Sequence, residues 1–112
     1  MICLDKKSLF EILLDSSSND AEKDDAVIEL GINFQDEETV DFLIKVSNDS
    51  NFDEMIVASC GESLGQIWLR TQRIDYEKLT CLRGIALSEA LSLIKAKRPD
   101  WYKTYLDLYP KS

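Results

Sequence analysis

The chain has 112 residues, of which 45% are hydrophobic and 30% are charged, a balance that suits one globular domain over residues 1–112 and excludes a disordered chain. It contains no histidine, so catalytic sites of the Ser-His-Asp or Cys-His kind cannot be built. Its formal net charge of −8 is unevenly spread, because residues 1–54 carry 15 acidic and 4 basic side chains, whereas residues 55–112 carry 6 and 9.

Apolar residues recur at spacings of three and four along most of the chain, and glycine and proline are scarce, which predicts amphipathic helices and an all-α fold. Polar residues that cap helices precede the first four apolar stripes. Gly31 is placed to end the second helix, because glycine adopts the backbone conformation that often follows a helix. The first four helices are predicted over residues 5–15, 20–31, 36–46 and 53–70, starting at Asp5, Asn19 or Asp20, Asp36 and Asp53.

The next helical stretch is predicted from Asp75 to about Lys97. Gly84 weakens its middle, so the stretch forms either one helix or two. Pro99 ends this stretch and can start another helix, because proline suits the first helical position. The aromatic segment from Trp101 to Tyr109 is expected to lie across the end of the bundle as a cap, with its rings packed on the core.

Two segments within residues 9–68 are alike, which points to an internal repeat. Each has an amphipathic helix, a turn of Ser, Asn and Asp, and a second helix with a Leu-Gly pair, Leu30-Gly31 and, 34 residues later, Leu64-Gly65. The pattern resembles HEAT repeats, whose helical hairpins stack so that each covers its neighbour's apolar face. This resemblance implies two or three antiparallel hairpins with a C-terminal capping helix, although the usual Pro and Arg positions are absent. An ordinary helical bundle is the alternative.

One segment matches a catalytic motif, since residues 61–65 read Gly-Glu-Ser-Leu-Gly and fit GxSxG. In hydrolases this nucleophile elbow joins a strand to a helix, whereas here it lies within a helical pattern. We therefore interpret Gly61 and Gly65 as points of close packing between helices. The carboxylate clusters lack the spacing of a calcium loop and are explained as acids at helix starts. The sequence predicts no catalytic residue, no metal site, no cofactor and a protein that is not an enzyme.

The three cysteines, Cys3, Cys60 and Cys81, form no CxxC pair, and their number is odd. Neither a disulfide framework nor a zinc site is indicated, so buried reduced thiols in a cytoplasmic protein are expected. The apolar run Met1–Leu4 is too short for a signal peptide, and no other stretch is long enough to span a bilayer. We therefore expect a cytoplasmic location and no membrane contact.

A candidate partner-binding surface follows from placing residues about 100° apart around each helix. On the second and fourth helices, two sets of side chains point away from the apolar stripes. If the hairpins stack as in repeat proteins, the two sets merge into one acidic surface with apolar centres at Ile28 and Met55. Alternatively, Ile28 turns into the core and Met55 is an isolated exposed residue. The predicted partner-binding residues are Asp24, Asp25, Ile28, Met55, Ser59, Glu62 and Gln66.

The charge distribution indicates the kind of partner. The acidic first half lacks the basic footprint of nucleic-acid binding, and the short cluster of Lys95, Lys97 and Arg98 stands where a helix C-terminus favours cations. A concentrated negative field suits a basic protein, whose approach it would accelerate. The alternative is that the acidic surface only keeps the protein in solution.

A short, acidic, helical chain without catalytic residues resembles the immunity proteins of bacterial contact-dependent inhibition, which belong to toxin–immunity systems. The resemblance implies a tight inhibitor that covers the active site or substrate groove of a cognate toxin, such as a basic nuclease. It rests on size, charge and the helical repeat, and it transfers no functional residue. The alternative function is a small helical-repeat adaptor or a scaffolding subunit of a protein complex.

Overall fold

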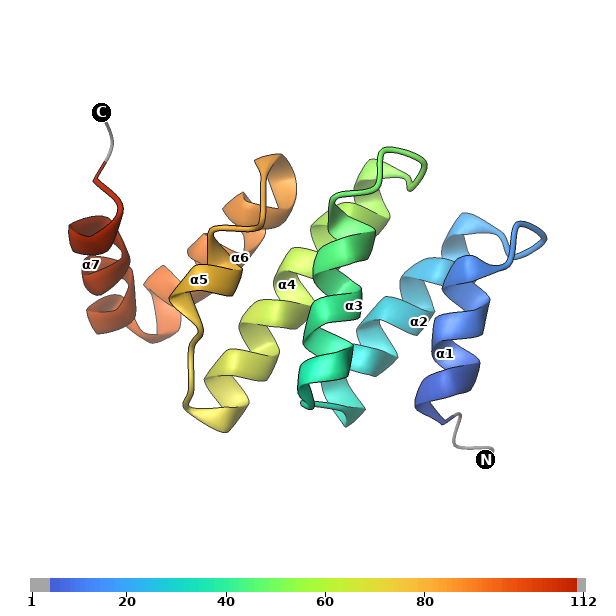
Figure 1. The fold of residues 1–112 in the computed structure, drawn as a ribbon, viewed down its shortest axis with the longest axis horizontal. Coiled ribbons are helices and arrows are strands. Elements are labelled where there is room, and N and C mark those ends of the chain that lie inside the picture. The colour runs from blue at the N-terminus through green and yellow to red at the C-terminus, as the bar shows by residue number, and fades with distance from the viewer. Residues whose placement is uncertain (1–4, 111–112) are drawn as a thin grey trace.

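A computed structural model describes residues 5–110, which form seven α-helices and no strand (Figure 1). The predicted all-α class is confirmed. None of these helices is long and apolar enough to cross a lipid bilayer. In chain order the helices are α1 Lys6–Leu14, α2 Asp20–Asn33, α3 Glu37–Ser47, α4 Glu54–Thr71, α5 Tyr76–Leu79, α6 Gly84–Lys97 and α7 Pro99–Leu108.

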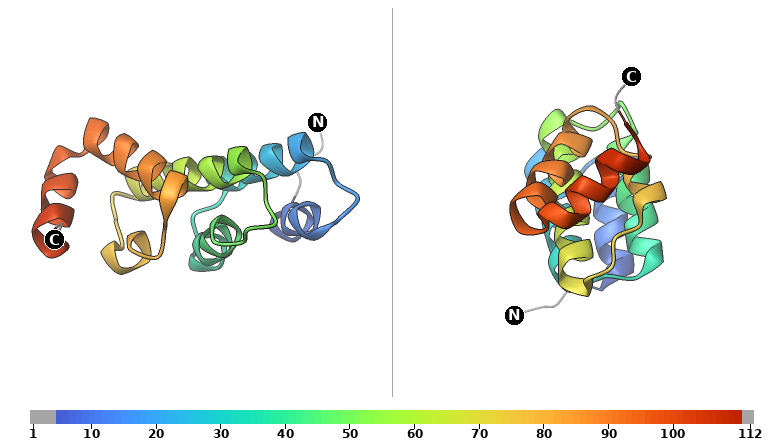
Figure 2. Two further views of the ribbon diagram at one scale, coloured as in Figure 1. Left: turned by 90° about the horizontal axis from the view of Figure 1, so that it is seen from above. Right: turned by 90° about the vertical axis from the view of Figure 1, so that its left-hand side faces the viewer.

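The helices form three hairpins, α1–α2, α3–α4 and α5–α6, which stack side by side in two rows (Figure 2). We call α2, α4 and α6 the inner row, and α1, α3 and α5 the outer row. In the inner row, α4 packs against α2 on one side and against α6 on the other. At the end of the array, α7 packs against α6. The predicted stack of hairpins with a C-terminal capping helix is therefore confirmed.

The first four helices begin at capping residues that the sequence predicted. The side chains of Asp5, Asn19, Asp36 and Asp53 each accept a hydrogen bond from a backbone N–H in the first turn. Each bond satisfies a donor that has no partner within its own helix. In α2 the arrangement is reciprocal, because the Glu22 carboxylate accepts a 3.2 Å bond from the backbone N–H of Asn19. Asn19, and not Asp20, is therefore the cap of α2.

The prediction that Gly31 ends α2 is wrong, because the helix continues to Asn33. Gly31 is buried against α4, where an added Cβ atom would lie 2.6 Å from the side chain of Ser63. Its counterpart in the repeat, Gly65, faces α6 in the same way, and a Cβ atom there would lie 3.0 Å from Cδ2 of Leu93. The two Leu-Gly pairs thus mark close approaches between successive helices of the inner row, not helix ends.

Gly84 divides the stretch after Asp75 into two helices. It is the first residue of α6 and has a φ angle of 54°, in the left-handed region that favours glycine. The preceding α5 is a single turn, and the buried side chains of Leu79 and Leu82 anchor the connection to the core. The outer helix of the third hairpin is therefore much shorter than α1 and α3.

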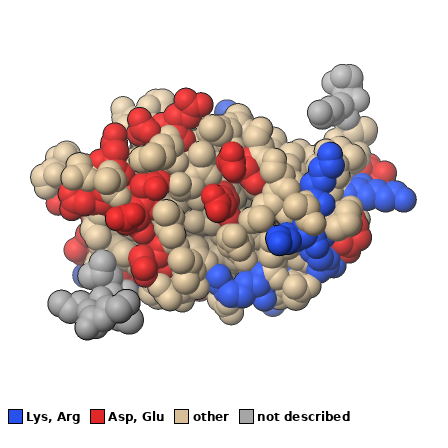
Figure 3. All heavy atoms as spheres, turned by 180° about the vertical axis from the view of Figure 1, so that it is seen from behind, with Lys and Arg blue, Asp and Glu red and all other residues tan. Residues whose placement is uncertain are grey.

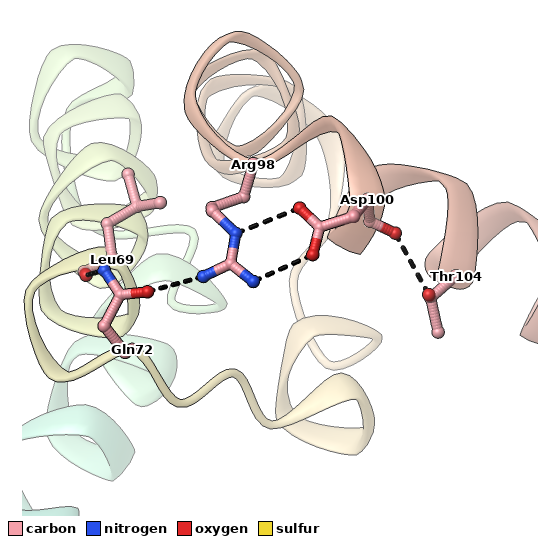
Figure 4. Close-up of polar contacts among 5 residues, drawn as sticks. All are labelled: Leu69, Gln72, Arg98, Asp100 and Thr104. Carbon is pink, nitrogen blue, oxygen red and sulfur yellow. Dashed lines mark hydrogen bonds and ion pairs between the residues drawn. The ribbon is translucent and has the colours of Figure 1, made fainter.

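Arg98 fixes the start of α7 (Figure 4). Its guanidinium donates two hydrogen bonds to the Asp100 carboxylate, at 2.9 and 2.8 Å, and a third to the Gln72 side chain after α4. It also lies 4.1 Å above the ring centre of the buried Trp101. The expected packing of aromatic residues on the core is correct for Trp101. It is wrong for Tyr109, which is 37% exposed because it follows the last turn of α7 and borders an open cleft.

The N-terminal edge of the array leaves an apolar side chain uncovered. Leu14 continues the apolar spacing of α1, but it is 70% exposed. It is the last residue of α1, in the first hairpin of the described residues, where no preceding hairpin packs over it. An end hairpin of a repeat array leaves on its outer side apolar groups that an internal hairpin would bury.

Candidate protein-binding surface

The inner row presents one side to solvent, which we call the rear face; Figure 3 shows it from behind. On α4, Ser63 donates a 3.1 Å hydrogen bond to the backbone carbonyl of Val27 on α2, and Gly31 lies against the same serine. These contacts set the register, so that residues about 34 apart lie at the same level, as in the sequence repeat. Ile28 on α2 is therefore level with Glu62 on α4.

Five of the seven predicted binding residues are exposed, on α2 and α4. Ile28 does not turn into the core, because its side chain is 42% exposed, and Met55 is 49% exposed. Asp25, Glu62 and Gln66 are exposed as well. The structure thus brings these five residues to the side of the molecule on which the sequence placed them, while their role in binding stays a prediction.

Asp24 and Ser59 differ from the prediction, because both are only partly exposed. They lie toward the seam between α2 and α4, where the neighbouring helix covers part of each side chain. One carboxylate oxygen of Asp24, Oδ1, is enclosed and has no hydrogen-bond donor. The charge of Asp24 also acts on the buried Cys60 thiol of α4. Asp24 therefore lies at the contact between α2 and α4, where one of its oxygens accepts no hydrogen bond, and it is not a freely solvated acid.

Ile32 is a rear-face residue that the sequence analysis missed. Its side chain is 60% exposed, one turn after Ile28 on the same side of α2. It was overlooked because Gly31 was expected to end the helix before it. The spacing of four between two isoleucines was the available signal, since residues at i and i+4 share a helix face.

Charge is segregated along the rear face (Figure 3). Acidic side chains gather over the half formed by α2 and α4, and lysine and arginine gather toward α6 and α7. Lys95 and Lys97 belong to the last turn of α6, and Arg98 is held by Asp100. These basic residues therefore serve a helix C-terminus and a helix junction, in line with the interpretation from sequence.

The four acidic residues at the start of and within α3, unlike those of α2, are paired with lysines. Lys6 on α1 pairs with Asp36 and Glu38 at 3.0 and 2.6 Å, and Lys78 on α5 pairs with Asp41 and Glu37 at 2.9 and 3.8 Å. These pairs connect α1 to α3 and α3 to α5. Within residues 5–110, by contrast, the acidic residues of α2 and Glu62 on α4 form no ion pair. The acidic residues of α2 and Glu62 are therefore left without a cationic partner in the described chain, whereas those of α3 are paired.

Asp36 gives the outer row a pH dependence that can be measured. Burial alone would raise the pKa of Asp36, but hydrogen bonds from Lys6 and Thr39 outweigh it and lower the pKa below its ordinary value of 3.8. The charged carboxylate of Asp36 therefore contributes its full stabilisation above the ordinary pKa of 3.8. This contribution is lost as the pH falls through the lowered pKa of the folded protein. We expect Asp36→Asn to reduce the free energy of unfolding at neutral pH by up to about 1 kcal/mol. Urea denaturation at several pH values should show this difference shrink below 3.8; a difference that stays constant contradicts the assignment.

The structure offers no catalytic use for the GxSxG motif. Residues 61–65 lie inside α4, and the Ser63 hydroxyl is engaged with the Val27 carbonyl in the contact between α2 and α4. The interpretation of Gly61 and Gly65 as packing points is confirmed by their burial against α6. Among residues 5–110, no three His, Cys, Asp or Glu side chains converge as metal ligands.

The cysteines differ in their surroundings. Cys60 is buried as expected, and burial, followed by the negative charge of Asp24, raises the pKa of its thiol to about 12. It therefore stays protonated and unreactive at neutral pH. The expectation of burial is wrong for Cys81, which is exposed because it lies in the turn between α5 and α6. Cys3, with the apolar run Met1–Leu4, lies outside the described residues.

A second candidate site is an open cleft of about 880 Å³ between the end of α4, α3, α5 and the C-terminal residues after α7. It exists because α5 is only one turn long and leaves a space beside Trp68 that a longer outer helix would fill. Its walls mix Tyr76 and Tyr109 with both acidic and basic side chains. With no dominant charge and no convergent polar groups, the cleft indicates no particular ligand.

Comparison with protein-family models, with curated proteins and with solved structures found no match to the chain. Its function is therefore inferred from its own residues.

Proposed function

We propose that the chain binds a cationic protein through the α2–α4 half of the rear face and thereby inhibits it. The observation that carries this proposal is the contrast between the paired acids of α3 and the unpaired acids of α2 and α4. Unpaired carboxylates around the exposed Ile28, Ile32 and Met55 form a charged rim about an apolar centre, an arrangement common in protein interfaces. A cationic surface would supply counter-charges to these unpaired carboxylates.

The more specific proposal is an immunity protein that acts in the cytoplasm on a cognate nuclease toxin. A nuclease binds the phosphates of its substrate in a basic groove, and an acidic helical face is complementary to the same groove. The small size, the acidic charge and the hairpin array support this proposal through their resemblance to known immunity proteins.

Affinity capture tests the proposed function. The tagged chain is used to capture proteins from a lysate of its source cells at low and high salt, and the bound proteins are identified and purified. An inhibitor should retain one basic protein, bind it tightly with a salt-sensitive association rate, and block its activity. Several weakly bound partners would favour the adaptor alternative. A basic partner whose activity is unaffected would refute inhibition and leave binding intact.

A further inference from the structure

The exposed side of α2 carries an apolar strip, which we call the α2 strip and define as Ala21, Ile28 and Ile32. At about 1.5 Å per residue, the strip is roughly 16 Å long, or three helical turns. Acidic residues border it on both sides, with Asp24 toward α4 and Glu29 on the opposite side. Its length and its borders are those of a helix-binding surface.

The backbone of α2 and α4 restricts what can lie on the strip. Their peptide groups are hydrogen-bonded within the helices, so the strip offers a partner no N–H or C=O, and residues 5–110 contain no strand edge. An extended segment laid there would bury its own backbone groups without partners. A helix satisfies its backbone internally and presents only side chains.

Charge determines which helix would fit. Asp24 is partly exposed at the seam between α2 and α4, and Asp25 and Glu62 add exposed carboxylates nearby. Lysine or arginine side chains along the edges of an apolar stripe would pair with these groups. The basic residues toward α6 and α7 would repel the same side chains, which confines the helix to the acidic half (Figure 3).

We propose that a cationic amphipathic helix of the partner docks along the α2 strip. Its apolar stripe covers Ile28 and Ile32, and its lysines or arginines pair with Asp24, Asp25 and Glu62. This inference rests on the proposed function and specifies the element that the chain recognises.

Two synthetic peptides of about fifteen residues, with identical Leu, Ala and Lys content, test the docking helix. In one, the leucines form a single helical stripe flanked by lysines; in the other, they are scattered around the helix. Binding to the full chain is measured by calorimetry and by NMR titration at low salt. We expect the striped peptide to bind at least about ten-fold more tightly and to shift the amide signals of α2 and α4.

Variants of the chain sharpen this test. Ile28→Ser combined with Ile32→Ser should weaken binding of the striped peptide about ten-fold, whereas Leu14→Ser, which changes an even more exposed apolar residue on α1, should leave it unchanged. If both peptides bind equally and the isoleucine substitutions do not change their affinity, the docking helix is refuted. The rear face would then remain an acidic surface that attracts cationic proteins. Binding of neither peptide would also refute the docking helix, and capture of a basic protein would then decide the proposed function separately.

Discussion

Replacing Asp25 and Glu62 together with lysine is expected to weaken binding of the cationic partner by at least about 2 kcal/mol, roughly thirty-fold in Kd. Both side chains are exposed on the rear face and unpaired within the described residues, so the change places two cations where the partner brings its own. Asp24 is left unchanged because a lysine there would disturb the seam. Opposite charges at the edge of an interface mainly speed encounter. Surface binding kinetics should therefore show slower association and a weaker dependence on salt.

A second double variant controls for net charge. Glu11→Lys with Asp107→Lys makes the same change in charge at two exposed positions on α1 and α7. It should leave affinity within a few-fold of the unmodified chain, and thermal unfolding should be little changed for both pairs. Equal losses in the two pairs would mean that total charge, and not the rear face, governs binding. Unchanged affinity in the folded Asp25 and Glu62 variant would remove this face from the interface.

The features that could be predicted from the sequence are those with a local cause. Each of the first four helices starts at a side chain that bonds its own first turn, so Asp5 or Asp53 marks the start without any tertiary information. The apolar spacing of three and four then determines which side of each helix is buried. For this reason the hairpin array and the exposed side of α2 and α4 were both accessible from the sequence.

The features that were missed depend on contacts between distant segments. Gly31 is a packing contact and not a helix end, because its missing side chain lets Ser63, 32 residues later, approach α2 closely. Asp24 is covered by a neighbouring helix that no local pattern places beside it. The same limit applied to the acids of α3, since only the stacking of the hairpins brings Lys6 and Lys78 to them. Which acidic surface is free for a partner could therefore be decided only from the structure.

Gly61→Ala is expected to lower the free energy of unfolding by about 3 kcal/mol or more. Gly61 is buried on α4 at its contact with α6, and an added Cβ atom would overlap the backbone carbonyl oxygen of Ala86. A helix backbone cannot rotate aside as a side chain can, so α4 and α6 would have to separate. Separation would loosen the close packing around Cys60 and Leu64. The better helix propensity of alanine, about 1 kcal/mol, opposes this loss but is smaller.

Gly65→Ala, one turn further along α4, is the matched control. Its added Cβ atom would lie 3.0 Å from Cδ2 of Leu93, the end of a flexible side chain that can move away. Since the gain in helix propensity offsets a small rearrangement, we expect its stability to stay within about 1 kcal/mol of the unmodified chain. Urea denaturation followed by circular dichroism compares the three proteins directly. Equal stability of the two variants would mean that α4 and α6 are not in backbone contact at Gly61, because only that contact distinguishes the two substitutions.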